Sequence, residues 1–174
     1  MKRVVAFLLL ISLFSCKEVS FKEAQPVSRR PLVSVPKILR GKYLTYKENG
    51  ELAKDTVIIN SMGYRFGYFS PEERTKATNQ YDDGVLSDSM VLKSYKGYYF
   101  LSLNQKPEWI LRVIKLQKNG DLLYMAPEQP GVNINEYIKR LSTLMPVDST
   151  RVNDKTIYQI DPSPQQLIDL IEEG

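Results

Sequence analysis

The stretch that decides the fold is 97–116, which reads GYYFLSLNQKPEWILRVIKL. Two runs rich in aromatic and β-branched residues, 97–103 and 109–116, lie on either side of a polar turn that contains a proline. This pattern is typical of a hairpin of two antiparallel strands. Large apolar groups occupy both sets of alternate positions in the first run, namely Tyr99, Leu101 and Leu103 on one face and Tyr98 and Phe100 on the other. A core needs only one face of a sheet, so large apolar groups on the second face call for something that covers them.

More short runs of the same kind surround this hairpin. They are 42–47, 56–60, 64–68, 85–93, 122–125 and 155–160. Asn49-Gly50 and Asn119-Gly120 separate neighbouring runs, and such dipeptides supply the positive φ angles of tight reverse turns. Within 64–68 three aromatic rings occupy alternate positions and therefore share one strand face. The middle of the chain is thus predicted to be a meander of strands joined by hairpins.

Helix signals follow the strands towards the end of the chain. Asn133 can cap a helix whose apolar residues recur at spacings of four, three and four, namely Ile134, Ile138, Leu141 and Met145. The segment 163–166 (SPQQ) combines a serine cap, a proline at the first helical position and a glutamine at the third. A similar box at 70–73 predicts at most a short exposed helix. The predicted fold is α+β and mainly antiparallel β: a curved sheet or small barrel, packed by one or two C-terminal helices.

The composition removes several classes of protein. The chain has 174 residues, no histidine, one cysteine and a net charge of +4. A single cysteine excludes an internal disulfide and a multi-cysteine zinc site, and the lack of histidine removes the commonest general base. The small positive excess is not that of a nucleic-acid-binding protein. Neither a phosphate-binding glycine loop nor a Gly-x-Ser-x-Gly motif occurs, so we expect a protein that is not an enzyme and binds no cofactor.

The first sixteen residues carry the most specific pattern. Lys2 and Arg3 precede an apolar run, 4–14, that would form about 16 Å of helix against a bilayer core of about 30 Å. A positive start, a short apolar run and a small residue at the cut are typical of a secretory signal peptide. The sole cysteine, Cys16, stands where this run ends, in the tetrapeptide LFSC at 13–16.

This tetrapeptide resembles the signal of bacterial lipoproteins, with a leucine three residues before the cysteine and a small residue directly before it. The resemblance implies removal of 1–15, a diacylglycerol on the Cys16 thiol and usually a fatty acid such as palmitate on the new amino terminus. It thereby implies a protein held by lipid in the bilayer of the cell envelope. In some bacteria an aspartate after the cysteine retains lipoproteins at the inner membrane, so Lys17 in that position favours the outer membrane. The rest of the chain resembles small β-rich bacterial lipoproteins, without a motif that transfers an activity.

The segment after the cysteine is expected to be flexible. Residues 17–36 contain three prolines and mixed charge, with no helical or strand period. We therefore divide the chain into a signal peptide (1–15), a lipidated N-terminus with a flexible tether (16–36) and one globular domain (37–174). Twenty extended residues span at most about 65–70 Å, which is enough to hold a domain clear of a membrane.

Four aromatic residues near the decisive hairpin are candidates for a ligand-binding face: Tyr95, Tyr98, Phe100 and Trp109. Stacked rings can line a site for a sugar or lipid, and the alternative for these rings is packing in the core or on the sheet surface. A closed sheet with a wide apolar interior would suit a lipid-like ligand, whereas a flat sheet under helices would suit a protein partner. The expected function is a membrane-anchored, non-enzymatic module that binds an envelope protein or a small molecule.

Acidic residues supply the alternative functions. Asp82, Asp83 and Asp88 cluster, but their spacing does not match a twelve-residue calcium loop, so we interpret them as a solvated loop and expect no metal. Glu108 beside Trp109 is the starting point for a carboxylate-dependent hydrolase of envelope glycans, for which the sequence supplies no partner acid. A structural or assembly role is a third interpretation, supported by the tether alone.

Overall fold

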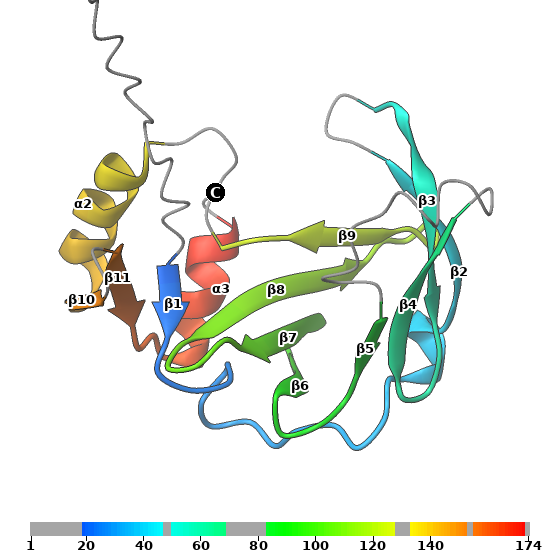
Figure 1. Cartoon of the computed structure of the whole chain (residues 1–174), viewed down its shortest axis with the longest axis horizontal. Coiled ribbons are helices and arrows are strands. Elements are labelled where there is room, and N and C mark those ends of the chain that lie inside the picture. The colour runs from blue at the N-terminus through cyan, green and yellow to red at the C-terminus, as the bar shows by residue number, and fades with distance from the viewer. Residues whose placement is uncertain (1–18, 47–49, 69–82, 128–132, 153–154, 173–174) are drawn as a thin grey trace, which may run out of the picture.

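The computed structural model describes residues 19–46, 50–68, 83–127, 133–152 and 155–172, which form two β-sheets and two α-helices (Figure 1). The larger sheet, called here the large sheet, has seven strands. In spatial order they are β10 (Val147–Val152), β11 (Lys155–Ile160), β1 (Val19–Phe21), β8 (Trp109–Leu116), β7 (Tyr98–Asn104) and β6 (Met90–Tyr95), with β9 (Leu122–Met125) also paired to β8. Neighbouring strands are antiparallel except β1 and β11, which run parallel.

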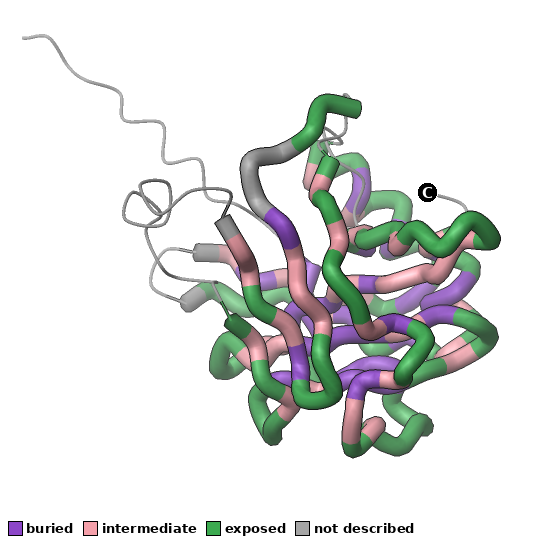
Figure 2. The backbone as a smooth tube through the Cα atoms, turned by 90° about the vertical axis from the view of Figure 1, so that its right-hand side faces the viewer, coloured by how far each residue is buried: buried purple, intermediate pink, exposed green. Residues whose placement is uncertain are grey.

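The second sheet, called here the small sheet, is an antiparallel meander at one end of the large sheet (Figure 1). It contains β2 (Gly41–Tyr46), β3 (Leu52–Ile59), β4 (Gly63–Tyr68) and β5 (Asp83–Val85) in that order. A short 3₁₀ helix, η1 (Lys37–Leu39), leads into β2. Figure 2 shows that the small sheet, nearest the viewer, is mainly exposed or intermediate, whereas the strands behind it carry most of the buried residues.

Both predicted C-terminal helices are present, and their caps are those that the sequence indicated. Helix α2 (Ile134–Leu144) begins after Asn133, whose side-chain oxygen accepts a hydrogen bond from the backbone N–H of Asn135 at 2.9 Å. Helix α3 (Pro164–Glu172) begins with a reciprocal capping box. The Ser163 N–H donates to the Gln166 side chain at 2.9 Å, and the Gln166 N–H donates to the Ser163 hydroxyl at 3.3 Å.

One face of the large sheet, called here the helix face, packs under α2 and α3. Its core contains strand residues such as Val19, Phe21, Phe100 and Val113, none of which is exposed to solvent. The helices contribute their apolar stripes, namely Tyr137, Leu141, Met145, Leu167, Ile168 and Leu170. Burial of these side chains is the main source of stability for the domain.

The opposite face of the large sheet, called here the cleft face, is turned towards the small sheet. Met90, Leu92 and Leu101 are buried on it, and side chains from both sheets pack around them. Both faces of 97–103 are therefore covered. The α+β class, mainly antiparallel, is confirmed. The described strands form open sheets, so the alternative of a small barrel was wrong.

One predicted strand is two strands. The run 85–93 is divided by a turn, in which the Ser87 N–H donates to the Met90 carbonyl at 3.0 Å. The Leu86 N–H meanwhile donates to the carbonyl of Met62 at 2.7 Å, in the turn between β3 and β4. Small polar residues at 87–89 make this turn, and the chain passes from the small sheet to the large one there.

The predicted flexible tether is also wrong for most of its length. Strand β1 lies inside 16–36, and Val19 and Phe21 have no exposed surface because β8 and β11 flank them and the helices cover them. Further on, the Lys93 ammonium donates to the carbonyls of Ala24 at 2.6 Å and Pro26 at 3.0 Å. The packed domain therefore begins at or before residue 19 rather than at 37.

Several expectations lie outside the described residues. These are the signal peptide and Cys16, the helix at 70–73, the Asn49 half of one turn and Asp82. Within the described part of the chain, no helix is both long enough and apolar enough to cross a membrane.

The cleft between the two sheets as candidate functional site

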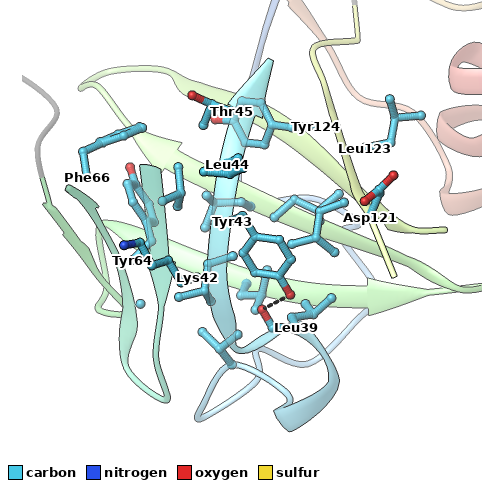
Figure 3. Close-up of a pocket in the computed structure, with 18 of the residues that line it drawn as sticks. Leu39, Lys42, Tyr43, Leu44, Thr45, Tyr64, Phe66, Asp121, Leu123 and Tyr124 are labelled. Carbon is cyan, nitrogen blue, oxygen red and sulfur yellow. Dashed lines mark hydrogen bonds between the residues drawn. The ribbon is translucent and has the colours of Figure 1, made fainter. Parts of the chain in front are cut away.

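A cleft of about 1100 Å³ separates the cleft face of the large sheet from the small sheet (Figure 3). The large sheet lines it with aliphatic side chains, including Leu92, Leu101 and Ile114, and with residues of β9. The small sheet lines it with Tyr43, Val57, Ile59, Tyr64 and Phe66. Nearly every side chain that lines the cleft is apolar or aromatic, as in most sites for small organic ligands.

Strand register places the aromatic groups on the inner side of the small sheet. Val57 pairs with Tyr43 on one side and with Phe66 on the other, and Ile59 pairs with Tyr64. Directly paired residues share a face, so these five side chains form one continuous layer. The rings of Tyr64 and Phe66 meet edge to face with centroids 5.8 Å apart, which fixes their orientation at the cleft wall.

The cleft is closed where the chain passes between the sheets. Segment 32–36 bridges them, because the Leu32 N–H donates to the Leu92 carbonyl at 2.8 Å and the Val35 N–H donates to the Ser61 carbonyl at 2.9 Å. Close backbone packing of β4 on β5 adds to this closure, since a Cβ on Gly63 would lie 1.8 Å from the carbonyl oxygen of Gly84. No residue other than glycine fits at position 63 without a backbone shift.

The cleft is open between β2 and β9, and this opening is called here the mouth. Large apolar side chains at the mouth are exposed to solvent, namely Leu44 (51%), Tyr46 (65%) and Tyr124 (59%). Figure 3 shows Leu44 and Tyr124 at this opening, with Leu123 on the other side of β9. Exposed apolar groups gathered at one place are typical of a binding surface.

The polar groups of the cleft are donors rather than bases. The Tyr43 hydroxyl donates to the Leu39 carbonyl at 3.0 Å, and burial raises the pKa of this tyrosine. Burial, together with the negative charge of Asp83, also raises the pKa of Tyr64. Both hydroxyls therefore stay protonated at neutral pH. Among the described lining residues, Lys42 and Asp121 alone carry charge, and the Asp121 carboxylate accepts a hydrogen bond from the Asn119 side chain at 2.6 Å.

The arrangement is suited to holding an apolar group rather than to acid–base chemistry. Asp121 is the one carboxylate among the described residues that line the cleft, so no second acid faces it there. Glu108 is half-buried at the start of β8 and does not line the cleft. Asp83 and Asp88 are exposed, and no group of three or more potential metal-ligating acids lies together in the described part of the chain.

The four aromatic residues proposed as a ligand face lie on the helix face instead. Tyr98 and Phe100 belong to the core under α3, and Tyr95 and Trp109 pack against it half-buried. None of the four lines the cleft. Each alternates in its strand with a residue of the cleft face. The structure thus shows for Tyr98 and Phe100 the core packing that was the alternative to a ligand face.

A polar chain fixes Tyr98 in that core. The Lys115 ammonium donates to the Tyr98 hydroxyl at 2.6 Å, and this hydroxyl donates to the Glu172 carboxylate at 3.1 Å. The hydrogen bond from Lys115, and the negative charge of Glu172 more weakly, raise the pKa of this lysine. Tyr98 therefore ties β7 and β8 to the end of α3 and is not available to a ligand.

The residues that do line the cleft were partly visible in the sequence. Alternating rings at 64–68 predicted an aromatic strand face, and Tyr64 and Phe66 form part of the cleft wall. What the sequence did not show is which sheet that face would oppose. Comparisons with models of protein families, with curated proteins and with solved structures found no match for this chain, so the proposal below rests on the residues themselves.

Proposed function

We propose that this chain is a lipid-anchored protein of the bacterial cell envelope whose domain binds an apolar ligand in the cleft and catalyses no reaction. The observation that carries the proposal is the cleft itself. It has a volume of about 1100 Å³, an apolar lining and an open mouth. Pockets for small ligands have volumes of about 300–1000 Å³, so this cleft is large enough for a long hydrocarbon group.

The expected energy of binding comes from the hydrophobic effect. Each buried CH₂ group of a ligand contributes about 0.8 kcal/mol, so a long alkyl chain gains several kcal/mol before the cost of ordering it. The tyrosine hydroxyls and the few charged groups of the cleft contribute little to the free energy of binding an ionic ligand. The cleft therefore favours fatty or amphiphilic molecules over sugars and nucleotides.

The anchor is proposed from the 13–16 tetrapeptide and the apolar run before it. A single acyl chain binds a bilayer only marginally, whereas two or three chains on Cys16 would make release very slow. The same pattern supports export, and Lys17 after the cysteine supports the outer membrane as the destination.

The anchor is tested by metabolic labelling with radioactive palmitate in a bacterial host. The wild-type chain should incorporate label and sediment with membranes, and Cys16→Ser should do neither. Ser12→Ala, a change within the apolar run, is the matched control and should behave as wild type. An unlabelled wild-type protein would contradict the anchor.

The cleft is tested with a fluorescent polyene fatty acid that brightens in apolar surroundings. Val57→Trp places a bulky ring in the cleft and should weaken binding about tenfold, which corresponds to about 1.4 kcal/mol. Val33→Trp makes the same substitution at a residue that is 94% exposed and does not line the cleft, so its affinity should be unchanged. Equal binding by both variants, or no binding by the wild type, would contradict the proposed site.

A further inference from the structure

The structure places the proposed anchor much closer to the domain than the sequence suggested. Val19 is fixed in the large sheet opposite Tyr158 of β11 and has no exposed surface. Val19 is three positions after Cys16 along the chain, and three residue steps reach at most about 11 Å. An acylated Cys16 would therefore hold the domain against the bilayer surface, because the 65–70 Å of reach expected for a tether does not exist.

The register of β8 shows which part of the domain lies near that anchor. Strands β1 and β9 pair with the same edge of β8, at Trp109 and at 113–116 respectively, and both run antiparallel to it (Figure 1). Phe21 pairs with Trp109 and Met125 pairs with Val113, so these two positions are about 13 Å apart along β8. Val19 lies on the Met125 side of Phe21, which brings the beginning of β1 closer still to the end of β9.

Strand β9 is one side of the mouth. Tyr124 lines the cleft from β9 and is exposed, and Leu44 and Tyr46 do the same from β2. The anchor therefore lies beside the strand that borders the mouth. An acylated Cys16 would bring the beginning of β1 to the bilayer, and the exposed apolar groups of the mouth lie a few residues from that point. Such groups lose unfavourable contact with water when they touch acyl chains.

We propose that the cleft takes its occupant from the bilayer to which the protein is anchored, and that this occupant is the hydrocarbon chain of a membrane phospholipid. The inference rests on the proposed function, since it needs both the acylated cysteine and an apolar binding cleft. The chain of the phospholipid enters between β2 and β9, and its head group stays outside at the level of Tyr46 and Tyr124. The terminal methyl end of the acyl chain lies at the closed end of the cleft, which segment 32–36 forms.

The test uses the full, acylated protein reconstituted in vesicles of phosphatidylethanolamine and phosphatidylglycerol. One arm adds a phospholipid with a photoactivatable group at the end of its acyl chain. After illumination, mass spectrometry locates the labelled peptides. We expect label on strands that line the cleft, in particular on 57–66 and 90–101.

Tyr124→Asp is the variant for this arm, because Tyr124 pairs with the cleft-lining Ile114 and is 59% exposed, so the carboxylate lies at the mouth and not in the core. It should lower labelling of the cleft about tenfold, which corresponds to about 1.4 kcal/mol. An unpaired charge in the path of a hydrocarbon chain costs more free energy than that. Val33→Asp is the matched control at an exposed position away from the cleft and should label as wild type.

The second arm places the same photoactivatable group in the fatty acids of the anchor on Cys16. Cleft label from this arm alone would mean that the protein buries its own anchor, and it would overturn the inference. An extended polypeptide found bound at the free edges of β2 and β9 would also overturn it, as would label confined to residues 17–22.

If palmitate labelling and fatty-acid binding succeed while the cleft stays unlabelled in vesicles, this inference fails and the proposed function stands. If the wild type binds no fatty acid at all, the proposed function fails with it.

Discussion

The two faces of the large sheet are covered in different ways. On the helix face, α2 and α3 lie directly on the strands and fill the space with side chains that are at most 7% exposed. On the cleft face, the small sheet covers Met90, Leu92 and Leu101 but leaves about 1100 Å³ between the layers. A pair of helices can follow a twisted sheet closely, whereas a second sheet joined at one side opens away from it. One strand, β7, thus contributes to stability with one set of side chains and to the candidate site with the other.

The strongest test of this comparison makes the same substitution on both sides. Phe100→Ala removes a ring without exposed surface from the helix face and should lower the free energy of unfolding by about 3–5 kcal/mol. Phe66→Ala removes a half-buried ring from the wall of the cleft and should cost less than about 2 kcal/mol, because no closed cavity forms. Urea denaturation followed by circular dichroism measures both. Equal losses would show that the cleft face is packed as tightly as the helix face.

A second test concerns how the small sheet is held. Gly63→Ala would bring a Cβ against the Gly84 carbonyl and should lower the free energy of unfolding by about 1–3 kcal/mol, with weaker fatty-acid binding. Gly41→Ala is the control in the same sheet, since the nearest atom to its Cβ would be 3.5 Å away. If Gly63→Ala lost no stability, the close packing of β4 on β5 would be refuted.

A third test returns to the helix face and probes a helix end. Ser163→Ala removes the hydroxyl of the capping box and should lower the free energy of unfolding by about 1 kcal/mol. Ser142→Ala lies on the exposed side of α2 and should leave stability unchanged or slightly raised. Thermal unfolding of the two variants would separate the effect of the cap from that of a serine elsewhere in a helix.

The smallest effect is a dependence on pH at the edge of the helix face. Burial lowers the pKa of Lys93 from 10.5, so the unfolded chain binds this proton more tightly than the folded protein does. The contribution of Lys93 to the free energy of unfolding therefore rises with pH between its lowered pKa and 10.5. The free energy of unfolding of the wild type minus that of Lys93→Met should therefore rise with pH in that range. Lys106→Met is an exposed control for the substitution. A difference that stays constant with pH would contradict the burial of a charged group.

Local signals in the sequence predicted local structure well. The SPQQ box at 163–166 and the cap at Asn133 became the starts of α3 and α2, and alternation in 97–103 correctly assigned Tyr99 and Phe100 to opposite faces. These features depend on residues within one turn or one strand of each other.

Features that depend on distant partners were not predictable in this way. Strand β1 has three residues, which are too few to show an alternation of apolar and polar positions. It is a strand because Val19 pairs with Tyr158 and Phe21 pairs with Ile160. The cleft is a relation between two sheets, and nothing within 64–68 indicates that Tyr64 will pack against a cluster containing Leu92 and Leu101 of the large sheet rather than on a helix. The alternation in β7 likewise does not indicate which of its two faces will line a cleft.

The parallel pairing of β1 with β11 also has a consequence for how the chain acquires its fold. Strand β1 is made first, but its partner β11 ends at Ile160, so almost the whole chain must be synthesised before β1 can pair with β11. Pairing across such a long separation is slow, because the entropy of closing the loop is lost before any contact is gained. A ribosome or a secretion channel that delivers the chain from its amino end would bring Trp109 of β8 to Phe21 first, and would leave Val19 and Phe21 without their β11 partners until delivery is nearly complete. Removal of the last twenty residues would leave β1 permanently unpaired on that side.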